Sequence, residues 1–337
     1  MGCEPGAPGV ASMAGHTIFT ARSPAGHGRP RSGEDARFMD LHARMGINVH
    51  RETWPTTAAL KGIEASGFGW VQIHTPPKEM LCDRERLRLH ARGVRAALEP
   101  TGLRLLLHGP DDLALGALDH DRAFDGLLDY AVEARAEIVV YHGLNHLDAD
   151  GPAGERSRLR AEGEERALAR LGKRAHALGV TVAVENLAPV FPGPPRLTHD
   201  PLRIHDLVRR LRNPSVGMLL DLGHAHVTSG LHGTDLEAVV ARVAPEVVLF
   251  HVHDNLGARR HGLGFPGVDP LRLDLHLPPG AGTLPWDRVR DVLLAHRAPL
   301  MLEIEPSHRP ASLPQLFEQS RAVLRGERPA SVGIAAA

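Results

Sequence analysis

The stretch Val180-Thr181-Val182-Ala183-Val184-Glu185-Asn186 is an apolar run, rich in β-branched residues, that ends on an acid and an amide. A short run that is apolar on both faces is typical of a strand buried within a parallel sheet. The segments 154–178 and 201–211 on either side are rich in Arg and Leu with amphipathic spacing, which predicts helices. A strand between two such helices predicts a parallel sheet with crossover helices.

The same alternation repeats along most of the chain. Strands are predicted at 46–50, 70–74, 103–108, 137–142, 180–185, 216–221, 247–251 and 300–303. Further helices are predicted at 83–98, 122–134, 235–243, 286–296 and 312–324. A doubly wound sheet shares this alternation, but eight strands favour an α/β fold that closes into a (β/α)8 TIM barrel.

A residue suited to metal binding or acid–base chemistry closes each predicted strand. These residues are His50, His74, His108, His142, Glu185, Asp221, His251 and Glu303. The C-terminal ends of the strands are where this fold carries its chemistry, and in a closed barrel they converge on one mouth. Three carboxylates crowded there repel one another unless a cation or protons neutralise them. With imidazoles among them, a divalent metal is the simplest explanation.

The neighbouring sequence adds candidates to this set. Asp221 and His224 lie three residues apart across a strand end, a spacing that suits one metal or two neighbouring metals. His253 lies on the same side of its strand as His251, and Asp274 and His276 lie in the long loop 256–284. Loops of this length are often functional, so a lid is one interpretation and a family-specific insertion without a catalytic role is the other.

Several of these residues also have structural interpretations. A lone histidine at a strand end is usually a hydrogen-bonded loop residue, and His50 and His74 are predicted to line the pocket without binding metal. Asp254 is interpreted as a turn or capping residue, and His226 as the start of a helix. A structural role can explain any one of these residues, but it is a weaker explanation for eight strands that all end on His, Asp or Glu.

Composition excludes several other classes of protein. The 337 residues carry a formal net charge of −1, so the total is not basic as in a dedicated duplex-DNA binder. There is no apolar run long enough for a membrane span, and the N-terminus lacks signal-peptide features. Two cysteines argue against a disulfide scaffold and favour a cytoplasmic location. The 22 histidines fit either metal ligation or coding bias.

The barrel is predicted to be the only domain. Residues 1–44 are rich in Gly, Pro, Ser and Arg without periodicity, which predicts a disordered tail and a true start as late as Met39 or Met45. The barrel would occupy residues 45–327, and residues 328–337 would form a flexible C-terminus. Homo-oligomerisation is left open.

Over about residues 45–325 the chain resembles the xylose isomerase-like barrel superfamily, which includes sugar isomerases, sugar epimerases and endonuclease IV. The segments that carry the resemblance are Glu185-Asn186, Asp221 to His224, His251 to Asn255, Asp274 to Trp286, and Leu302-Glu303.

The epimerases and isomerases of this group hold one divalent metal with a Glu, an Asp, a His and a second Glu. The resemblance places these roles on Glu185, Asp221, His251 and Glu303. It implies a sugar or sugar phosphate isomerase or epimerase of carbohydrate metabolism, with Glu185 and Glu303 as the catalytic acid and base. A metal such as Mn, Zn, Co or Mg would polarise a carbonyl of a small sugar-like substrate. His74, Asn186 and His253 are expected to contact that substrate.

Endonuclease IV suggests an alternative, a zinc phosphodiesterase that acts on abasic DNA or another phosphate ester. Its three zinc ions have nine ligands, and the pattern falls on His108, His142, Glu185, Asp221, His224, His251, Asp274, His276 and Glu303. Up to three metals are therefore possible, with His108, His142, His224, Asp274 and His276 as additional metal or substrate ligands. Hydrolase and lyase activities both stay open.

The chain departs from both the endonuclease IV pattern and the epimerase pattern, and these departures bear on which substrate is expected. Asp111 and Asp112 follow the third strand and would repel a phosphate backbone, so nucleic acid is not the expected partner. The ketohexose epimerases carry an Arg soon after the strand-seven His, whereas this chain reads Asn255-Leu256-Gly257, with Arg259 and Arg260 slightly later. A non-enzymatic barrel is disfavoured, because uncompensated buried carboxylates cost stability.

Overall fold

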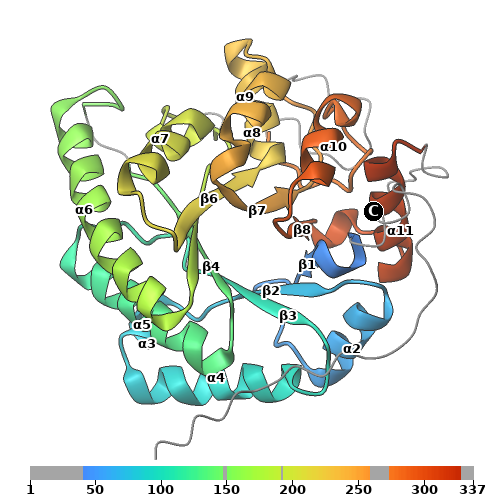
Figure 1. Cartoon of the computed structure of the whole chain (residues 1–337), viewed down its shortest axis with the longest axis horizontal. Coiled ribbons are helices and arrows are strands. Elements are labelled where there is room, and N and C mark those ends of the chain that lie inside the picture. The colour runs from blue at the N-terminus through green and yellow to red at the C-terminus, as the bar shows by residue number, and fades with distance from the viewer. Residues whose placement is uncertain (1–40, 147–149, 191–192, 259–272, 328–337) are drawn as a thin grey trace, which may run out of the picture.

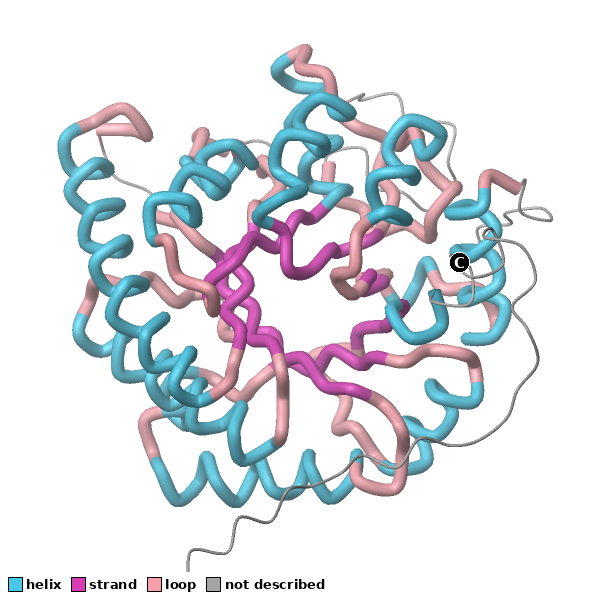
Figure 2. Tube along the Cα trace, in the orientation of Figure 1, coloured by secondary structure: helices cyan, strands magenta, loops and turns pink. Residues whose placement is uncertain are grey.

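The structure, a computed structural model, describes residues 41–146, 150–190, 193–258 and 273–327. Its eight strands pair in sequence order, all in parallel, and β8 pairs with β1, so the predicted closed barrel is confirmed. The strands are β1 (Met45–Asn48), β2 (Trp70–His74), β3 (Arg104–His108), β4 (Ile138–His142), β5 (Thr181–Glu185), β6 (Val216–Asp221), β7 (Val247–Val252) and β8 (Leu300–Leu302). Figure 2 shows the ring of strands enclosed by helices.

The helices surround this ring (Figure 1). They are α2 (Thr57–Ala65), α3 (Lys78–Leu81), α4 (Arg84–Leu98), α5 (Leu118–Ala134), α6 (Glu155–Leu178), α7 (Pro201–Leu211), α8 (Leu222–His232), α9 (Leu236–Val243), α10 (Trp286–Ala295) and α11 (Leu313–Arg325). Short 3-10 turns lie at Leu197–His199, Ala244–Glu246 and Pro306–His308. Each predicted helix is present within a few residues, whereas α2, α3 and α8 were not predicted.

Local signals explain where the helices begin and end. Asp83 caps α4, with its side chain accepting from the backbone N–H groups of Glu85 and Arg86. α7 combines the Asp200 cap with a proline at its first position, where no helical hydrogen bond is lost. α6 ends at Gly179, whose φ of 69° lies in the left-handed region that glycine adopts without strain.

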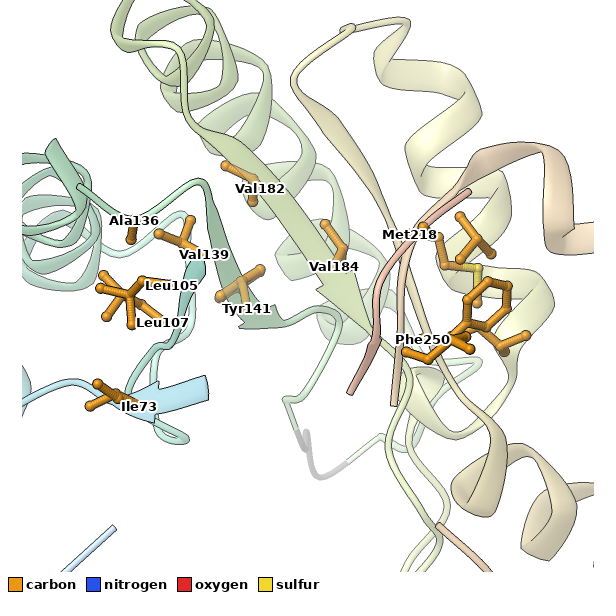
Figure 3. Close-up of a cluster of buried hydrophobic side chains, with 14 of the residues drawn as sticks. Ile73, Leu105, Leu107, Ala136, Val139, Tyr141, Val182, Val184, Met218 and Phe250 are labelled. Carbon is orange, nitrogen blue, oxygen red and sulfur yellow. The ribbon is translucent and has the colours of Figure 1, made fainter. Parts of the chain in front are cut away.

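The hydrophobic core has two layers, because successive side chains of a strand point to opposite faces. Outward-facing residues such as Val182 and Phe250 pack under the helices, and Figure 3 shows a group of them. Inward-facing residues fill the lower part of the barrel: Trp70, Leu106, Ile138, Val140, Ala183, Leu219, Leu249 and Met301. This packed interior forms a rigid floor under the polar residues above it.

Residues 41–44, which the sequence assigns to the tail, belong to the described structure. Residues 41–44 form a helical turn in which Leu41 is buried, and the Arg44 guanidinium donates to the carbonyls of Leu293 (2.8 Å) and Ala298 (3.1 Å). The rest of the predicted tail and the predicted flexible C-terminus lie outside the described residues. No helix in the described part of the chain is long and apolar enough to span a membrane.

Two helical glycines make a matched test of how closely the helices pack. A Cβ on Gly126 in α5 would lie 2.0 Å from the backbone oxygen of Leu81, whereas a Cβ on Gly163 in α6 would meet only the Arg166 side chain at 3.9 Å. We expect Gly126→Ala to destabilise the protein by about 1 to 3 kcal/mol through this clash. Gly163→Ala should be neutral or stabilise by up to about 1 kcal/mol, because alanine favours helix. Denaturant unfolding of both variants measures the difference, and equal stabilities would contradict the close packing of α5 on α3.

Candidate active site

The functional side chains occupy inward-facing strand positions directly above the apolar floor. In β5, for example, Ala183 belongs to the floor and Glu185 comes two residues later, on the same face. The register pairs Glu185 with His142 on one side and Asp221 with His251 further around the barrel. The two-residue period therefore explains why residues far apart in sequence meet at one mouth.

The central group consists of Glu185, Asp221, His251 and Glu303, whose ligand atoms lie within 4.8 Å of one another. His251 Nδ1 lies 3.1 Å from a carboxylate oxygen of Glu185, 3.1 Å from one of Glu303 and 3.6 Å from one of Asp221. All four residues are buried. Three carboxylates thus surround one imidazole nitrogen in a site that little solvent reaches.

A second group, His108, His142 and Glu185, shares its glutamate with the first. The Nε2 atoms of the two histidines lie 3.2 Å apart. Glu185 Oε2 lies 3.3 Å from His142 Nε2 and 3.6 Å from His108 Nε2, yet it has no hydrogen-bond partner. Glu185 therefore reaches both groups, with one oxygen toward each.

A third group contains His224, His253, Asp274 and His276. The Asp274 carboxylate lies 3.2 Å from His224 Nε2 and 2.8 Å from His276 Nε2. His253 stacks on His276 with ring centroids 4.0 Å apart. The five additional ligand candidates from the sequence thus lie in groups next to the central one.

Backbone carbonyls fix the orientation of three site histidines. The Nδ1–H groups of His108, His224 and His276 donate to the carbonyl oxygens of Gly109 (2.8 Å), Asn186 (2.8 Å) and Glu303 (2.7 Å), respectively. A carbonyl can only accept, so Nδ1 carries the proton. In the neutral imidazole Nε2 then offers its lone pair to the cluster, which is the usual arrangement of a metal-binding histidine.

Asp254 anchors the loop that brings Asp274 and His276 to the mouth. Its carboxylate accepts from Trp286 Nε1 (2.8 Å) and from the backbone N–H groups of Asn255, Gly280 and Leu284, and its backbone pairs with Leu277. The interpretation of Asp254 as a turn residue fits these bonds. Of the predicted lid, residues 259–272, which include Arg259 and Arg260, lie outside the described residues.

Asp221 shapes the chain as well as the site. Its Oδ1 accepts from the backbone N–H of His224 at 2.7 Å and caps α8, which therefore starts directly after β6 and not at His226. Asn186 and His253, for which the sequence predicts substrate contact, are both fully buried. The Asn186 amide bonds the backbone of Asp221, and His253 Nε2 lies 3.0 Å from its carboxylate. Both thus hold Asp221 in place.

The groups open into a cavity of about 640 Å³. Its lining includes Asn48, His50, Arg51, His74, His108, Asp111, His142, Glu185, Leu187, Ala188, Pro189, Val190, His224, Leu273, Asp274, His276, Glu303, Ile304, Glu305 and Pro306. β1 ends at Asn48, so His50 lies in the following loop, but both His50 and His74 line the cavity as expected. Arg51 and Asp111 form an ion pair at its rim (2.8 Å).

One buried polar residue of the site was missed from the sequence. Gln72 is fully buried in β2, and its amide bonds both His251 and Glu303. The available signal was a polar residue at an inward position of an otherwise apolar strand, because a buried amide needs partners for its donor and acceptor groups.

The protonation of the cluster follows from its crowding. Burial lowers the pKa of His251, but the carboxylates of Glu303 and Glu185 outweigh burial and hold that pKa well above its ordinary value. Burial likewise raises the pKa of Glu185, but the imidazoles of His251, His108 and His142 together outweigh burial, so that this pKa lies well below the usual range. In His74 burial prevails and lowers the pKa to about 3. Without a metal, protons on the imidazoles balance the carboxylates.

A divalent cation fits these residues. Glu185 Oε2 is buried, has no hydrogen-bond partner and faces two imidazole nitrogens. A bare carboxylate oxygen of this kind is costly unless a cation or a proton satisfies it. The donor set of carboxylate oxygens and imidazole nitrogens suits Zn, Mn, Co or Mg.

The raised histidine pKa values predict how the stability of metal-free protein depends on pH. Burial lowers the pKa of His276, but Asp274 outweighs it and raises the pKa to about 9. A raised pKa contributes stability below about 6.5, the unfolded value, and this contribution is lost as the pH rises through about 9. We expect the unfolding temperature of chelator-treated protein to fall by about 5 °C between these pH values, since one pKa unit corresponds to about 1.4 kcal/mol.

Saturating Mn²⁺ or Zn²⁺ should remove this decline, because a metal takes the place of the protons and binds better as they leave. Asp274→Asn should weaken the decline in the metal-free protein, since it removes the carboxylate that raises the pKa of His276. Scanning calorimetry across this pH range measures both effects. A metal-free protein that is equally stable or more stable at pH 9 would contradict this account of the site.

Comparison with known proteins identifies the family of this chain. A sequence model of the xylose isomerase-like TIM barrel matches residues 60–326. No curated protein sequence shows a significant match.

Solved structures share the fold at low sequence identity. A D-tagatose 3-epimerase-like protein is 17% identical, with a TM-score of 0.59 over 84% of this chain and 96% of that one. A 3-keto-D-glucoside 4-epimerase from E. coli is 15% identical, with a TM-score of 0.59 over 84% and 99%. A xylose isomerase domain protein from Alicyclobacillus acidocaldarius is 19% identical, with a TM-score of 0.59 over 84% and 97%. At these identities the likeness establishes the fold, and the sequence match over most of the barrel shows that this chain belongs to the xylose isomerase-like TIM barrel family.

Proposed function

We propose that this protein is a divalent-metal-dependent isomerase or epimerase of a sugar, a sugar phosphate or a related hydroxycarbonyl compound. One observation carries the proposal: Glu185, Asp221, His251 and Glu303 converge within 4.8 Å, and both glutamates also line the cavity. A site that combines metal ligands with two cavity-lining carboxylates can bind a polar substrate and move a proton on it. The epimerases among the solved structures of this fold support the choice of reaction.

Glu185, Asp221, His251 and Glu303 would hold the metal. When bound, the cation would act as a Lewis acid on the substrate carbonyl and so acidify the adjacent C–H group. Asn186 and His253 would fix Asp221 through their hydrogen bonds to it. The imidazoles of His108, His142 and His224 would bind substrate hydroxyl groups at the wall of the cavity.

The two glutamates would exchange protons with the substrate. Burial raises the pKa values of Glu185 and Glu303, but the surrounding imidazoles, His251 above all, together outweigh burial and hold both values well below the ordinary range. Each glutamate is therefore ionised at neutral pH and can accept a proton. Glu185 turns Oε1 toward His251 in the central group and Oε2, which has no hydrogen-bond partner, toward His108 and His142, so Oε2 would satisfy its need for a partner by accepting the substrate proton while Oε1 serves the central group. The C–H electron pair would move toward the carbonyl oxygen. Glu303 would take a proton from the solvent of the cavity and return it to the same carbon from the other side, and Glu185 would release the proton it had accepted to that solvent.

Replacement of either glutamate tests this scheme. We expect Glu185→Gln and Glu303→Gln each to slow proton exchange by about 10²- to 10⁴-fold, the usual contribution of general acid–base catalysis. The readout is deuterium incorporation from solvent, followed by NMR on metal-loaded protein, into the ketose, aldose or sugar phosphate that the wild-type protein turns over fastest in a screen of these compounds. The exposed Glu237→Gln variant, on the outside of the barrel, serves as a control. Metal content must be measured in parallel, and exchange at the wild-type rate in the double variant would contradict the scheme.

A second candidate function is hydrolysis of a phosphate ester at a multinuclear metal site. The observation that favours it is the presence of the His108–His142–Glu185 and His224–Asp274–His276 groups beside the central one. Clustered metals activate water and stabilise a leaving oxygen. Arg51 and Asp111 neutralise each other at the rim, so this pair offers a polyanionic substrate no net attraction, which is why this function ranks second.

Metal content separates the two functions. We expect about one Mn, Co, Zn or Mg ion per chain in protein purified without chelator or metal-binding tag, because the central group alone offers four buried ligands. Elemental mass spectrometry measures the stoichiometry. About three Zn ions per chain would instead favour the phosphodiesterase, and abasic-site DNA would then be the first substrate to test.

A further inference from the structure

Gln72 is a polar residue at a position where the buried interior of the barrel would be expected to hold an apolar one. It faces inward from β2 with no exposed surface, and its register partner Leu106 belongs to the apolar floor. Its amide nitrogen donates to Glu303 Oε1 at 2.8 Å, and its amide oxygen lies 2.8 Å from His251 Nε2. The amide therefore joins two members of the central group.

Chemistry fixes the direction of both hydrogen bonds. The Glu303 carboxylate can only accept, so the NH₂ end of the amide must face it. The amide oxygen then faces His251 Nε2, and because this oxygen can only accept, Nε2 must carry a hydrogen. The lone pair of the neutral imidazole is thereby placed on Nδ1, the atom that faces the carboxylates of Glu185 and Glu303 at 3.1 Å.

His251 differs in this respect from the other oriented histidines of the site. His108, His224 and His276 donate Nδ1–H to backbone carbonyls, so they turn Nε2 toward the cluster. His251 turns Nδ1 toward it, and its Nε2–H bonds to a side chain and not to the backbone. Its orientation can therefore be removed by one substitution, which is not true of the others.

We propose that Gln72 is a positioning residue of the metal site, which holds His251 in its Nε2–H tautomer and restrains the Glu303 carboxylate at the same time. The inference rests on the proposed function, since it concerns the same metal. Glutamine suits the position because it is neutral and offers a donor and an acceptor together. A carboxylate would repel Glu303, and an apolar side chain would release both ligands.

Metal affinity is the direct test, and it needs no substrate. The full-length protein, freed of metal, is titrated with Zn²⁺ in competition with a chelator, and its Co²⁺ form is examined by visible absorption. Gln72→Met keeps the approximate volume but removes both hydrogen bonds. We expect its Kd for Zn²⁺ to rise about 10- to 100-fold, the usual effect of losing a group that orients ligands, and its Co²⁺ spectrum to change.

Two comparisons keep the test decisive. Leu106→Met alters the neighbouring inward position. The Leu106 side chain is apolar and cannot hydrogen-bond the metal site, so this variant should have the wild-type Kd and Co²⁺ spectrum. If Gln72→Met is too unstable to titrate, Gln72→Asn replaces it. This variant keeps the amide on a side chain one methylene too short to reach both partners, and its Kd should also rise.

The outcomes separate this inference from the proposed function. If wild-type protein binds no divalent metal, the proposed function fails. If it binds metal and the Gln72 variants bind within about threefold of it with the same Co²⁺ spectrum, the positioning role alone is overturned. A purely structural role would lower the unfolding temperature equally with and without metal, and would leave Kd unchanged.

Discussion

The crowding of Glu185, Asp221 and Glu303 around one imidazole is the constraint on which the rest of the site depends. Three buried carboxylates are tolerable only if positive charge is supplied among them. Protonated histidines can supply it, as the raised pKa values of His251 and His276 indicate, and a divalent cation can supply it in their place. The proposed exchange of protons for a cation thus follows from the packing itself.

The barrel makes this crowding possible because each of the repelling carboxylates is held by a different strand. The carboxylates come from different strands, each of which is fixed by an apolar floor below and by helices outside. Asp254 fixes the loop that carries Asp274 and His276, through hydrogen bonds that its carboxylate accepts from Trp286 and from backbone N–H groups. Each carboxylate of the central group comes from a different strand end, and the rigidity of the scaffold keeps the side chains from moving apart.

The sequence was most informative where chemistry coincides with strand periodicity. The closed barrel followed from the repeated apolar runs, and the convergence of residues such as Glu185 and His251 followed from their places at strand ends. The exact end of β1 was not predictable, because a two-residue difference leaves the apolar pattern almost unchanged. The start of α8 was missed because Asp221 serves both as a site residue and as a helix cap. Roles that the sequence assigns to individual residues stay predictions.

Gln72 and the loop anchored by Asp254 show what periodicity cannot supply. Their importance depends on which atoms meet across the barrel, and neither partner of Gln72 is near it in sequence. The same limit applies to the choice between isomerase and phosphodiesterase. Both reactions would use the central carboxylates, so the difference must lie in the flanking groups that share or adjoin Glu185 and in whether they bind substrate oxygens or further metals. Because Glu185 directs one oxygen to His251 and the other to His108 and His142, it is the residue at which a one-metal site would become a larger one.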